Sequence, residues 1–305
     1  MNDGVLLADK APSGTSHDVV QRVRRILGEK RIGHCGTLDP GATGLLVLTA
    51  GQATRLTRFL ISAPKIYAGE IRFGAATDTY DAHGTVVAEA PIDRLDPRAL
   101  AAAMQCFLGT LPQMAPPFSA KKIQGRKYYE LARRGEEVPP VAKEVTIYEF
   151  AATGALADGL LPFLLSCSSG TYVRSVAHDL GQALGCGAHL ASLRRLQVGP
   201  FRVEDAIGLP DLERAVAAGV RGGWWVPFDA IPLPFGELTA DATQELRIAH
   251  GQAVLIRGLE AGEGDWVKVL NRRRELIAVG AVTERIGAGA VGIVQPKIVF
   301  AGRPA

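Results

Sequence analysis

The twelve residues 33–44 place the strongest limit on how this chain can fold. They read Gly-His-Cys-Gly-Thr-Leu-Asp-Pro-Gly-Ala-Thr-Gly, so five of the twelve are glycine or proline. A stretch of this composition turns sharply, lets the backbone come close to a ligand and cannot continue as a helix. Asp39 lies at its centre, and Pro40 disfavours a helical conformation at the residue before it. We therefore expect a carboxylate on an irregular loop between two regular elements.

Two roles are open for the Asp39 carboxylate. A carboxylate held on a non-helical loop is well placed to act as a nucleophile or a general base. Aspartate before proline is also common in turns, so Asp39 can be a turn residue without chemistry. A phosphate-binding loop fits less well, because the Gly-Lys-Ser/Thr ending of the Walker pattern is absent from residues 33–44.

Regular elements are expected on both sides of this loop. Apolar residues at helical spacing predict an amphipathic helix over residues 16–27, with Ser16 as N-cap and Gly28 as the C-terminal stop. The arginines of this helix fall away from the apolar stripe, toward solvent or a ligand. After the loop, the apolar run of residues 45–48 suits a buried strand.

The next part of the chain follows the same two periodicities. Strands are predicted over residues 65–73 and 160–167, and a turn over residues 78–84. A helix is predicted over residues 173–184, ending near Gly185. These strand and helix patterns are consistent with a mixed α and β protein.

A further helix is predicted after Asp96, which can cap it, with Pro97 in the first turn. One face of this helix carries Leu100, Met104, Phe107 and Leu108. Residues 112–144 are rich in proline and in basic residues, with a short helical stretch near residues 128–134, and we interpret them as an inserted flap.

The chain has a predicted domain boundary in the proline-rich residues 227–234. Beyond it, short β-like segments alternate with glycines, which predicts a small, mostly β module. These segments are residues 253–256, 266–270, 276–279 and 291–294.

The bulk properties exclude several classes of protein. A formal net charge of +3 on 305 residues does not by itself indicate a nucleic-acid partner, although local clusters of lysine and arginine can form either a basic face or ordinary solvated surface. The four cysteines form no C-x-x-C pair and the six histidines no H-x-x-x-H spacing, which argues against a structural zinc site and a disulfide framework. No apolar run approaches the roughly 18 residues that span a bilayer, and the polar N-terminus does not resemble a signal peptide. We expect a cytoplasmic, reduced and metal-free protein.

Two more segments contain residues suited to chemistry. In residues 168–175 (Ser-Ser-Gly-Thr-Tyr-Val-Arg-Ser), Arg174 lies near a strand-to-helix junction, where it can pair with a buried carboxylate by two bonds or simply lie at the surface. In the Lys-Ile-Tyr sequence of residues 65–67, strand alternation puts Tyr67 on the face of two other apolar residues. Alone, such a tyrosine is more often part of the core than catalytic.

Taken together and in this order, the loop and these two segments resemble the TruB family of bacterial tRNA pseudouridine-55 synthases. The resemblance runs from about residue 4 to residue 204, and residues 236–300 are similar to the PUA-type RNA-binding domain. Further matching segments are Thr15–Val20, Ala76–Asp81, Gly185–Leu190 and Leu193–Leu196.

The resemblance implies an α+β fold with a pseudouridine-synthase-like mixed or antiparallel sheet, flanking helices and a small C-terminal β-rich, PUA-like domain. The catalytic domain is expected over residues 1–232, with an inserted RNA-binding thumb at about residues 112–144, and the PUA-like domain over residues 236–305. The implied activity is isomerisation of the T-loop uridine of tRNA, position 55, to pseudouridine. It would proceed by base flipping and an aspartate-dependent rearrangement of the glycosidic bond, without cofactor or metal.

The resemblance also assigns roles to residues. Asp39 would be the catalytic carboxylate, Arg174 its partner, and Tyr67 the side chain that stacks on the target base and assists proton transfer. His34 would stack into the space that the flipped base leaves, although it can instead satisfy hydrogen bonds within its loop. The other implied substrate and RNA contacts are Leu193 at the pocket, Tyr172, Lys10 and, in the thumb, Lys121, Lys122, Arg126 and Lys127.

Two departures from the family pattern bear on the site. Family members usually begin with D-K-P-x-G-x-T-S, whereas residues 9–16 read Asp-Lys-Ala-Pro-Ser-Gly-Thr-Ser, which leaves the shape of an N-terminal turn open. Cys35 stands where the family usually has alanine, and an accessible thiol there would make the site sensitive to thiol reagents.

The expected partner is the T-arm stem-loop of tRNA, with no membrane, no obligate protein partner and a monomeric state. Two alternatives remain open: an RNA-guided pseudouridine synthase subunit and a non-catalytic tRNA-binding chaperone. Activity of the isolated chain on bare tRNA separates the first alternative from the stand-alone enzyme. An effect on tRNA that survives Asp39→Asn identifies the second.

Overall fold

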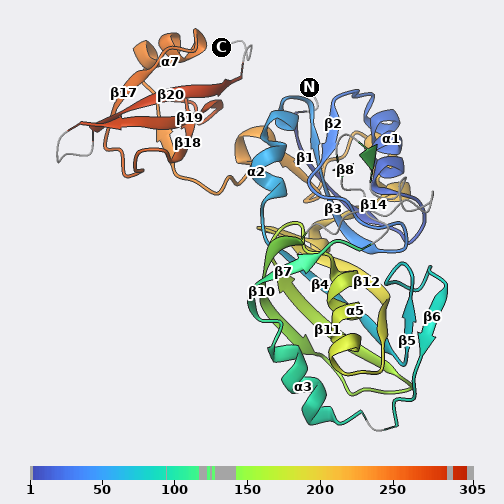
Figure 1. Cartoon of the computed structure of the whole chain (residues 1–305). Coiled ribbons are helices and arrows are strands. Elements are labelled where there is room, and N and C mark those ends of the chain that lie inside the picture. The colour runs from blue at the N-terminus through green and yellow to red at the C-terminus, as the bar shows by residue number, and fades with distance from the viewer. Residues whose placement is uncertain are drawn as a thin grey trace.

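Two sheets organise the chain in the computed structural model, which describes residues 3–93, 95–116, 122–123, 126–127, 142–286 and 291–300. The larger sheet has eleven strands and forms the body, and a five-stranded sheet near the C-terminus lies to one side of it (Figure 1). The fold is therefore α+β, as expected. Within the described part of the chain, no helix combines the length and apolar character that crossing a membrane requires.

The large sheet is mixed and mostly antiparallel. Only the pairs β1–β14 and β3–β12 run parallel among its described strands. Its main path is β14 (Ile207–Gly208), β1 (Gly4–Lys10), β3 (Thr43–Ala50), β12 (Ala188–Val198), β4 (Lys65–Phe73), β11 (Leu160–Cys167), β10 (Ala142–Ala152) and β7 (Gly109–Met114). Three short strands attach to this path, namely β2 (Ile32–His34), β13 (Phe201–Arg202) and β15 (Trp225–Pro227).

The strands β1 and β3 are buried on both faces. In β3, Leu46 and Leu48 face a core shared with helices α1 (Ser16–Leu27) and α6 (Leu209–Ala217). Leu45 and Val47 face the opposite core, which includes the short helix α2 (Thr57–Ile61) and the aromatic ring of Phe228. Each fully buried side chain of this size contributes roughly 1.5–3 kcal/mol, so an uninterrupted apolar run is what a strand between two cores needs.

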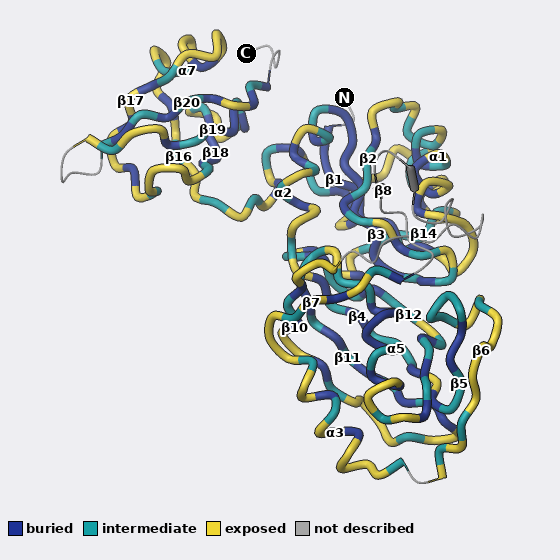
Figure 2. Tube along the Cα trace, in the orientation of Figure 1, coloured by how far each residue is buried: buried dark blue, intermediate teal, exposed yellow. Residues whose placement is uncertain are grey.

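The other half of the sheet has its own core. Helices α3 (Pro97–Gln105) and α5 (Val173–Ala183) pack with β4, β10, β11 and β12 (Figures 1 and 2). The described chain also contains a two-stranded sheet in which the partly buried β5 (Ala75–Thr77) pairs with the exposed β6 (Val86–Glu89). The central strands β12 and β4 make the junction between the two halves.

Helix α1 matches the predicted range, but its cap does not. Thr15, not Ser16, is the N-cap: its side chain accepts a hydrogen bond from the Asp18 backbone, and the Asp18 carboxylate accepts one from the Thr15 N–H. This reciprocal capping box satisfies two free helix donors at once. Ser16 is the first helical residue, and its hydroxyl bonds to Leu38 instead. Gly28 ends the helix in the left-handed conformation, as predicted.

Helix α3 is shorter than its apolar pattern indicated. Asp96 caps it and Pro97 is its first residue, but the helix ends at Gln105. Phe107 therefore reaches the core from beyond the helix, where its ring meets Phe150 edge-on. Leu108 is exposed, so its predicted place on the packed face was wrong.

The two ends of the predicted flap are strands of the sheet edge. Residues 109–114 form β7 and residues 142–152 form β10, and the two pair with each other. Between them, the backbones of β8 (Lys122–Ile123) and β9 (Arg126–Lys127) pair as a small hairpin. The predicted helical stretch near residues 128–134 lies outside the described residues, as does Lys121.

The five-stranded sheet has the order β16 (Glu237–Thr239), β18 (Trp266–Leu270), β19 (Leu276–Arg285), β20 (Val291–Val299) and β17 (Val254–Arg257). All four predicted β segments lie largely within its strands. Helix α7 (Ala242–Ala249), which the sequence pattern did not indicate, covers part of it. Edge-on contacts of Phe59 with Phe235 and Trp266 join this sheet to α2 of the body.

Candidate active site

One pocket, of about 680 Å³, brings together the residues that the sequence singled out for chemistry. It lies where the loop 33–44, the strands β4 and β12, and the start of α5 meet. Five of the predicted site residues line it: Asp39, Tyr67, Tyr172, Arg174 and Leu193. We call this cavity the Asp39 pocket.

The Asp39 carboxylate pairs with the Arg174 guanidinium. The distance from Arg174 Nε to Asp39 Oδ2 is 2.9 Å, and Arg174 Nη2 donates to Asp39 Oδ1 at 3.4 Å. The arginine side chain is 7% exposed, whereas the aspartate side chain is 42% exposed. A forked contact of this kind fixes the carboxylate in orientation while leaving it open to the pocket. The predicted proximity of these two residues is therefore present.

Arg174 has a second acidic partner, Asp81, which the sequence reasoning did not select. Arg174 Nη1 donates to Asp81 Oδ2 at 3.2 Å and to the Thr79 carbonyl oxygen at 3.0 Å. Tyr80 between them has a positive φ of 67°, and its ring stacks on His178 of α5 with centroids 3.7 Å apart. A non-glycine residue in this conformation is strained, and strain of this kind gathers at functional sites. The only sequence signal was the matching segment Ala76–Asp81.

Three side chains hold the backbone around Asp39. The first is Ser16: its hydroxyl donates to the Leu38 carbonyl oxygen at 3.0 Å and accepts from the Leu38 N–H at 2.8 Å. Helix α1 thus fixes the residue directly before the catalytic candidate. The serine cannot cap its own helix as well, which explains why Thr15 does so.

The second is Lys10, predicted as an RNA contact. Its side chain is buried, and Nζ donates to the carbonyl oxygens of Pro40 and Ala42 at 2.8 Å and of Ala11 at 3.0 Å. All three donors of the ammonium are used in this way. Burial lowers the pKa of Lys10, and the nearby Asp39 opposes that shift. Lys10 therefore stabilises the backbone of the loop that carries Asp39 and has no exposed charge to offer to RNA, which corrects its predicted role as an RNA contact.

The third is Arg195 on β12. Its Nη2 donates to the Gly36 carbonyl oxygen at 3.1 Å, its Nη1 to Thr37 at 3.4 Å and its Nε to Leu45 at 2.8 Å. Carbonyl groups on both sides of Asp39 are thus bonded to side chains from three elements. Such support reduces the reorganisation that a reacting group needs.

Tyr67 lies on β4 with its side chain turned into the Asp39 pocket, and it is 6% exposed. Burial raises the pKa of its hydroxyl, and the positive charge of Arg195 opposes this shift. The phenol therefore needs help from its surroundings before it can accept a proton near neutral pH.

Lys65, two residues earlier on the same face of β4, also lines the pocket and is buried. Its Nζ donates to the carbonyl oxygens of Ile61 at 2.9 Å and Ala63 at 2.7 Å. Burial, with a contribution from Arg195, lowers the pKa of Lys65 to about 8. Sequence reasoning quoted this lysine only as the start of the Lys-Ile-Tyr segment.

The remaining predicted contacts have mixed surroundings. Tyr172 precedes α5. Its backbone N–H donates to Gln113 Oε1 at 2.7 Å, and its carbonyl oxygen accepts from Gln113 Nε2 at 2.9 Å. Leu193 lies on β12, and its carbonyl oxygen accepts from the Thr43 hydroxyl at 3.4 Å.

His34 ends β2 and is half-buried, and burial lowers its pKa, which favours the neutral ring. The side chains of Lys122, Arg126 and Lys127 lie outside the described part of the chain.

Cys35 does not provide the reactive thiol that its position suggested. Its side chain is fully buried, and burial raises its pKa to about 12. Reactive cysteines are accessible and have lowered pKa values, so the expected sensitivity at this residue is not supported. The surface thiol among the described residues is Cys106.

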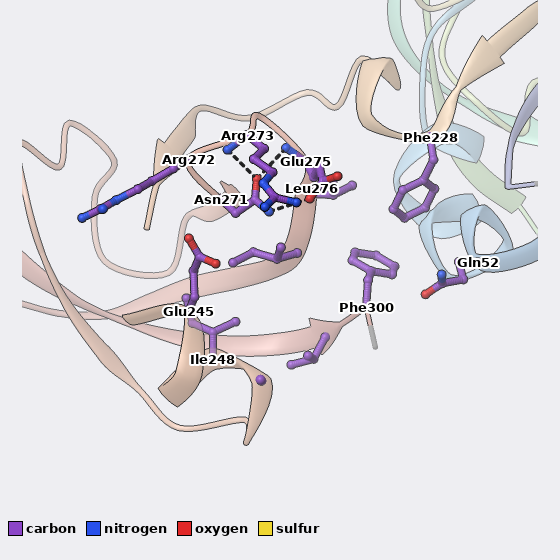
Figure 3. A pocket seen from close by; sticks show the side chains of 13 residues that line it. Gln52, Phe228, Glu245, Ile248, Asn271, Arg272, Arg273, Glu275, Leu276 and Phe300 are labelled. Atoms are coloured by element: carbon purple, nitrogen blue, oxygen red, sulfur yellow. Dashed lines mark hydrogen bonds between the residues drawn. The ribbon is translucent and has the colours of Figure 1, made fainter. Parts of the chain in front are cut away.

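A second pocket, of about 500 Å³, lies at the junction of the body and the C-terminal sheet (Figure 3). The rings of Phe228 and Phe300 meet edge-on at its inner end, 4.9 Å apart. At the outer end, Asn271 accepts hydrogen bonds from the backbone of Arg273 and Glu275, and Arg272 points away from the two rings. We call it the Phe228 pocket. It contains none of the predicted catalytic residues, and in the described residues no group of three metal-ligating side chains occurs in either pocket.

Two family models match the chain. Residues 24–173 match the TruB family pseudouridylate synthase N-terminal domain, and residues 174–221 match the tRNA pseudouridylate synthase B C-terminal domain. The second match covers β12–β14, which are strands of the large sheet, and the helices α5 and α6, which pack against that sheet. It includes no strand of the five-stranded sheet.

Relatives of known name match most of the chain. The tRNA pseudouridine synthase B of Thermobifida fusca is 39% identical over 99% of this chain and 100% of that protein. The enzyme of the same name from Chromohalobacter salexigens is 43% identical over 83% of this chain and 82% of its own length.

Solved structures share the fold. The archaeal box H/ACA sRNP Nop10-Cbf5 complex contains a chain with a TM-score of 0.72 and 25% identity, covering 99% of this chain and 87% of that one. A Cbf5-Nop10-Gar1 complex gives a TM-score of 0.74 at 25% identity, covering 99% and 86%.

Proposed function

The chain belongs to the TruB family of pseudouridylate synthases, and we propose that it isomerises the T-loop uridine of tRNA, position 55, to pseudouridine with Asp39 as the catalytic carboxylate. The observation that carries this proposal is the Asp39–Arg174 pair in the Asp39 pocket. The carboxylate is partly exposed to the cavity, whereas its partner Arg174 is buried.

The chemistry explains why a single carboxylate is needed. The N1–C1′ bond breaks with its electron pair staying on uracil, the base rotates, and C5 bonds to C1′. Asp39 supports this either by adding covalently or by stabilising positive charge on the sugar as the base departs. Arg174 holds the carboxylate in one orientation, aimed at the pocket, because its guanidinium contacts both carboxylate oxygens.

The last step requires a base, and we assign it to Tyr67. The C5–H bond breaks, its electron pair forms the C5=C6 bond, the N1=C6 pair moves to N1, and N1 takes up a proton. A phenolate oxygen next to the stacked uracil is suited to receive the C5 proton and becomes a phenol in doing so. Its position in the pocket supports this role.

Substrate entry requires base flipping, because a uridine inside a folded T-loop is not accessible. Extrusion costs roughly a few kcal/mol, which contacts to the flipped base and the emptied space must offset. We assign Leu193 and Tyr172 to the flipped nucleotide and His34 to the emptied space. The basic residues of the thumb, Lys121, Lys122, Arg126 and Lys127, are proposed to contact phosphates.

We propose further that residues 1–232 are the catalytic domain and residues 236–305 a PUA-like RNA-binding domain. The separate five-stranded sheet with its own core supports this division. The proposed partner is the T-arm of tRNA, acted on by a monomer that needs no obligate protein partner. The proposed location is the cytoplasm.

The test is the release of tritium from tRNA labelled at uridine C5, with wild type compared with Asp39→Asn. Release by wild type alone, mapped to the T-loop uridine, is the expected result. Asn keeps the size of the side chain and removes its charge, so a filter-binding assay should show RNA affinity within a few-fold. The absence of release from a folded tRNA would overturn the stand-alone activity.

A second candidate is supported by the fold shared with chains from the Cbf5 complexes. In that case the chain would act only with a guide RNA and partner proteins. Activity of the purified chain on bare tRNA excludes it. A tRNA-folding effect that persists in Asp39→Asn would reveal a chaperone role instead of, or beside, catalysis.

A further inference from the structure

Arg195 is a buried cation with unusual partners. Its side chain is 1% exposed, and no carboxylate among the described residues lies within ion-pair distance of it. Its hydrogen bonds go to backbone carbonyl oxygens of Gly36, Thr37 and Leu45. A buried charge without an opposite charge carries a large free-energy cost. A residue kept at that cost is a candidate for a role in function.

The sheet places Arg195 between the two elements that carry Asp39 and Tyr67. Strand β12 lies between β3, which continues from the Asp39 loop, and β4. Arg195 is opposite Gly44 on β3 and opposite Tyr67 on β4. A β-carbon on Gly44 would lie 2.3 Å from the Arg195 carbonyl oxygen, so only glycine allows this close approach of β3.

The Arg195 and Tyr67 side chains share one face of the sheet. Residues directly opposite in an antiparallel pair have side chains about 5 Å apart on the same side. Both side chains line the Asp39 pocket and both are buried. Burial raises the pKa of the Tyr67 hydroxyl, and Arg195 is the strongest influence against that shift.

We propose that Arg195 is a positioning residue of the isomerisation, which fixes the Asp39 loop relative to Tyr67 and keeps a positive charge beside the phenol oxygen. This inference rests on the proposed function. In the final step the Tyr67 phenolate takes the C5 proton and becomes a phenol. The C5–H electron pair forms the C5=C6 bond, the N1=C6 pair moves to N1, and N1 takes a proton from water. The adjacent guanidinium favours the phenolate that this step consumes.

The experiment places 3-fluorotyrosine at position 67 and follows its ionisation by fluorine NMR as pH rises. The variants are Arg195→Gln, which removes the charge, and Arg195→Lys, which keeps it. Arg202→Gln, on an exposed residue of β13, is the matched control. Loss of an adjacent positive charge should raise the tyrosine midpoint by about one pH unit or more in Arg195→Gln. The tyrosine midpoint in Arg195→Lys should stay within about half a pH unit of the wild-type midpoint, and the midpoint in Arg202→Gln should equal that of wild type.

The second readout is single-turnover tritium release by the same variants with ordinary tyrosine at position 67. The rate should fall by roughly tenfold or more in Arg195→Gln and less in Arg195→Lys, with RNA affinity within a few-fold in both. Equal midpoints in the Gln and Lys variants, or a midpoint in Arg195→Gln that is unchanged from wild type, would overturn the proposal. If Arg195→Gln does not fold, a midpoint in Arg195→Lys raised by a full unit would overturn it as well. Because the NMR titration needs no turnover, a failure of the proposed function leaves this result readable.

Discussion

The Asp39 pocket and the Phe228 pocket are of similar size but hold their charges differently. In the Asp39 pocket, Lys65, Arg174 and Arg195 are buried, and their donors are bonded to backbone carbonyls or to carboxylates. In the Phe228 pocket, Arg272 and Arg273 are exposed on a turn, and the buried part is aromatic and aliphatic.

This difference supports the proposal that the chemistry takes place in the Asp39 pocket and not in the Phe228 pocket. A buried cation polarises its neighbours through a low dielectric and holds them in one geometry, whereas an exposed cation is screened by water and salt. Both pockets are concave, so shape alone does not distinguish them. The burial of charge does, and it predicts that matching substitutions in the two pockets will have unequal effects.

The largest contrast is expected between Arg174→Met and Arg273→Met. Removing Arg174 leaves Asp39 and Asp81 without their shared partner, which should lower the free energy of unfolding by about 3 kcal/mol, the low end for a broken buried pair because Asp39 is 42% exposed. Turnover should fall by roughly 10²–10³-fold. Arg273→Met should change stability by less than about 0.5 kcal/mol. Urea unfolding and tritium release measure both, and similar losses in the two variants would remove the distinction between the pockets.

The buried ammonium of Lys65 should make stability depend on pH. Burial lowers its pKa to about 8 from 10.5, so between these values the unfolded chain binds more protons than the folded one. The free energy of unfolding should then rise with pH across this window, and the cost of burying the charge is fully present below pH 8. The difference between wild type and Lys65→Met isolates this residue from other groups that titrate there.

The free energy of unfolding of wild type minus that of Lys65→Met should become more positive, by up to roughly 3 kcal/mol, as pH rises from the lower to the upper end of the window. Urea unfolding at a series of pH values gives the curve, and Lys30→Met controls for the loss of an exposed lysine. A flat difference curve would show that burial does not penalise the Lys65 charge.

A smaller effect is expected from Asp81→Asn, which keeps the shape of the side chain and removes its charge. Arg174 would then bond more freely with Asp39 and lose its charged partner in the turn 78–84, where it keeps the hydrogen bond to the Thr79 carbonyl oxygen. Misplacement of the pair should lower turnover by roughly 10–100-fold with little change in RNA affinity. Asp93→Asn, at an exposed position, is the matched control. A turnover rate within twofold of wild type would mean that Asp81 does not position Arg174.

The smallest effect is expected from Arg272→Gln in the Phe228 pocket. If this exposed arginine contacts a phosphate of the RNA, its loss should weaken binding a few-fold and reduce the slope of log affinity against log salt by about 1. Turnover of bound RNA should stay unchanged. Filter binding at several salt concentrations and single-turnover rates separate these two quantities. A lowered rate with unchanged affinity would place chemistry near the Phe228 pocket.

Much of the local structure was predictable from residue patterns. The strands over residues 65–73 and 160–167 have the predicted bounds, and α1 and α5 lie where helical spacing placed them. The errors are at the ends of elements: the cap of α1 is Thr15, and α3 ends before Phe107. Ends are decided by hydrogen bonds to distant groups, such as that between Ser16 and Leu38, which no local pattern contains.

The candidate site was predictable in part. Asp39, Tyr67 and Arg174 were singled out because each belongs to a recognisable segment, and the fold brings all three to one pocket. Asp81, Lys65 and Arg195 were not selected, since an isolated aspartate, lysine or arginine has an ordinary surface role as its simplest interpretation. Lys10 was wrongly predicted to contact RNA, because the sequence alone does not show whether a lysine is buried.

By itself, the sequence determined the helices α1, α3 and α5, several strands and a carboxylate on an irregular loop, because periodicity and turn chemistry act over neighbouring residues. The α+β class was inferred from the family resemblance. The tertiary structure alone decided that β12 lies between β3 and β4, joining strands more than 100 residues apart in the chain. That placement buries Arg195 between the Asp39 loop and Tyr67. Burial and pairing of charges depend on which distant segments meet, and those contacts are set by the packing of the whole sheet.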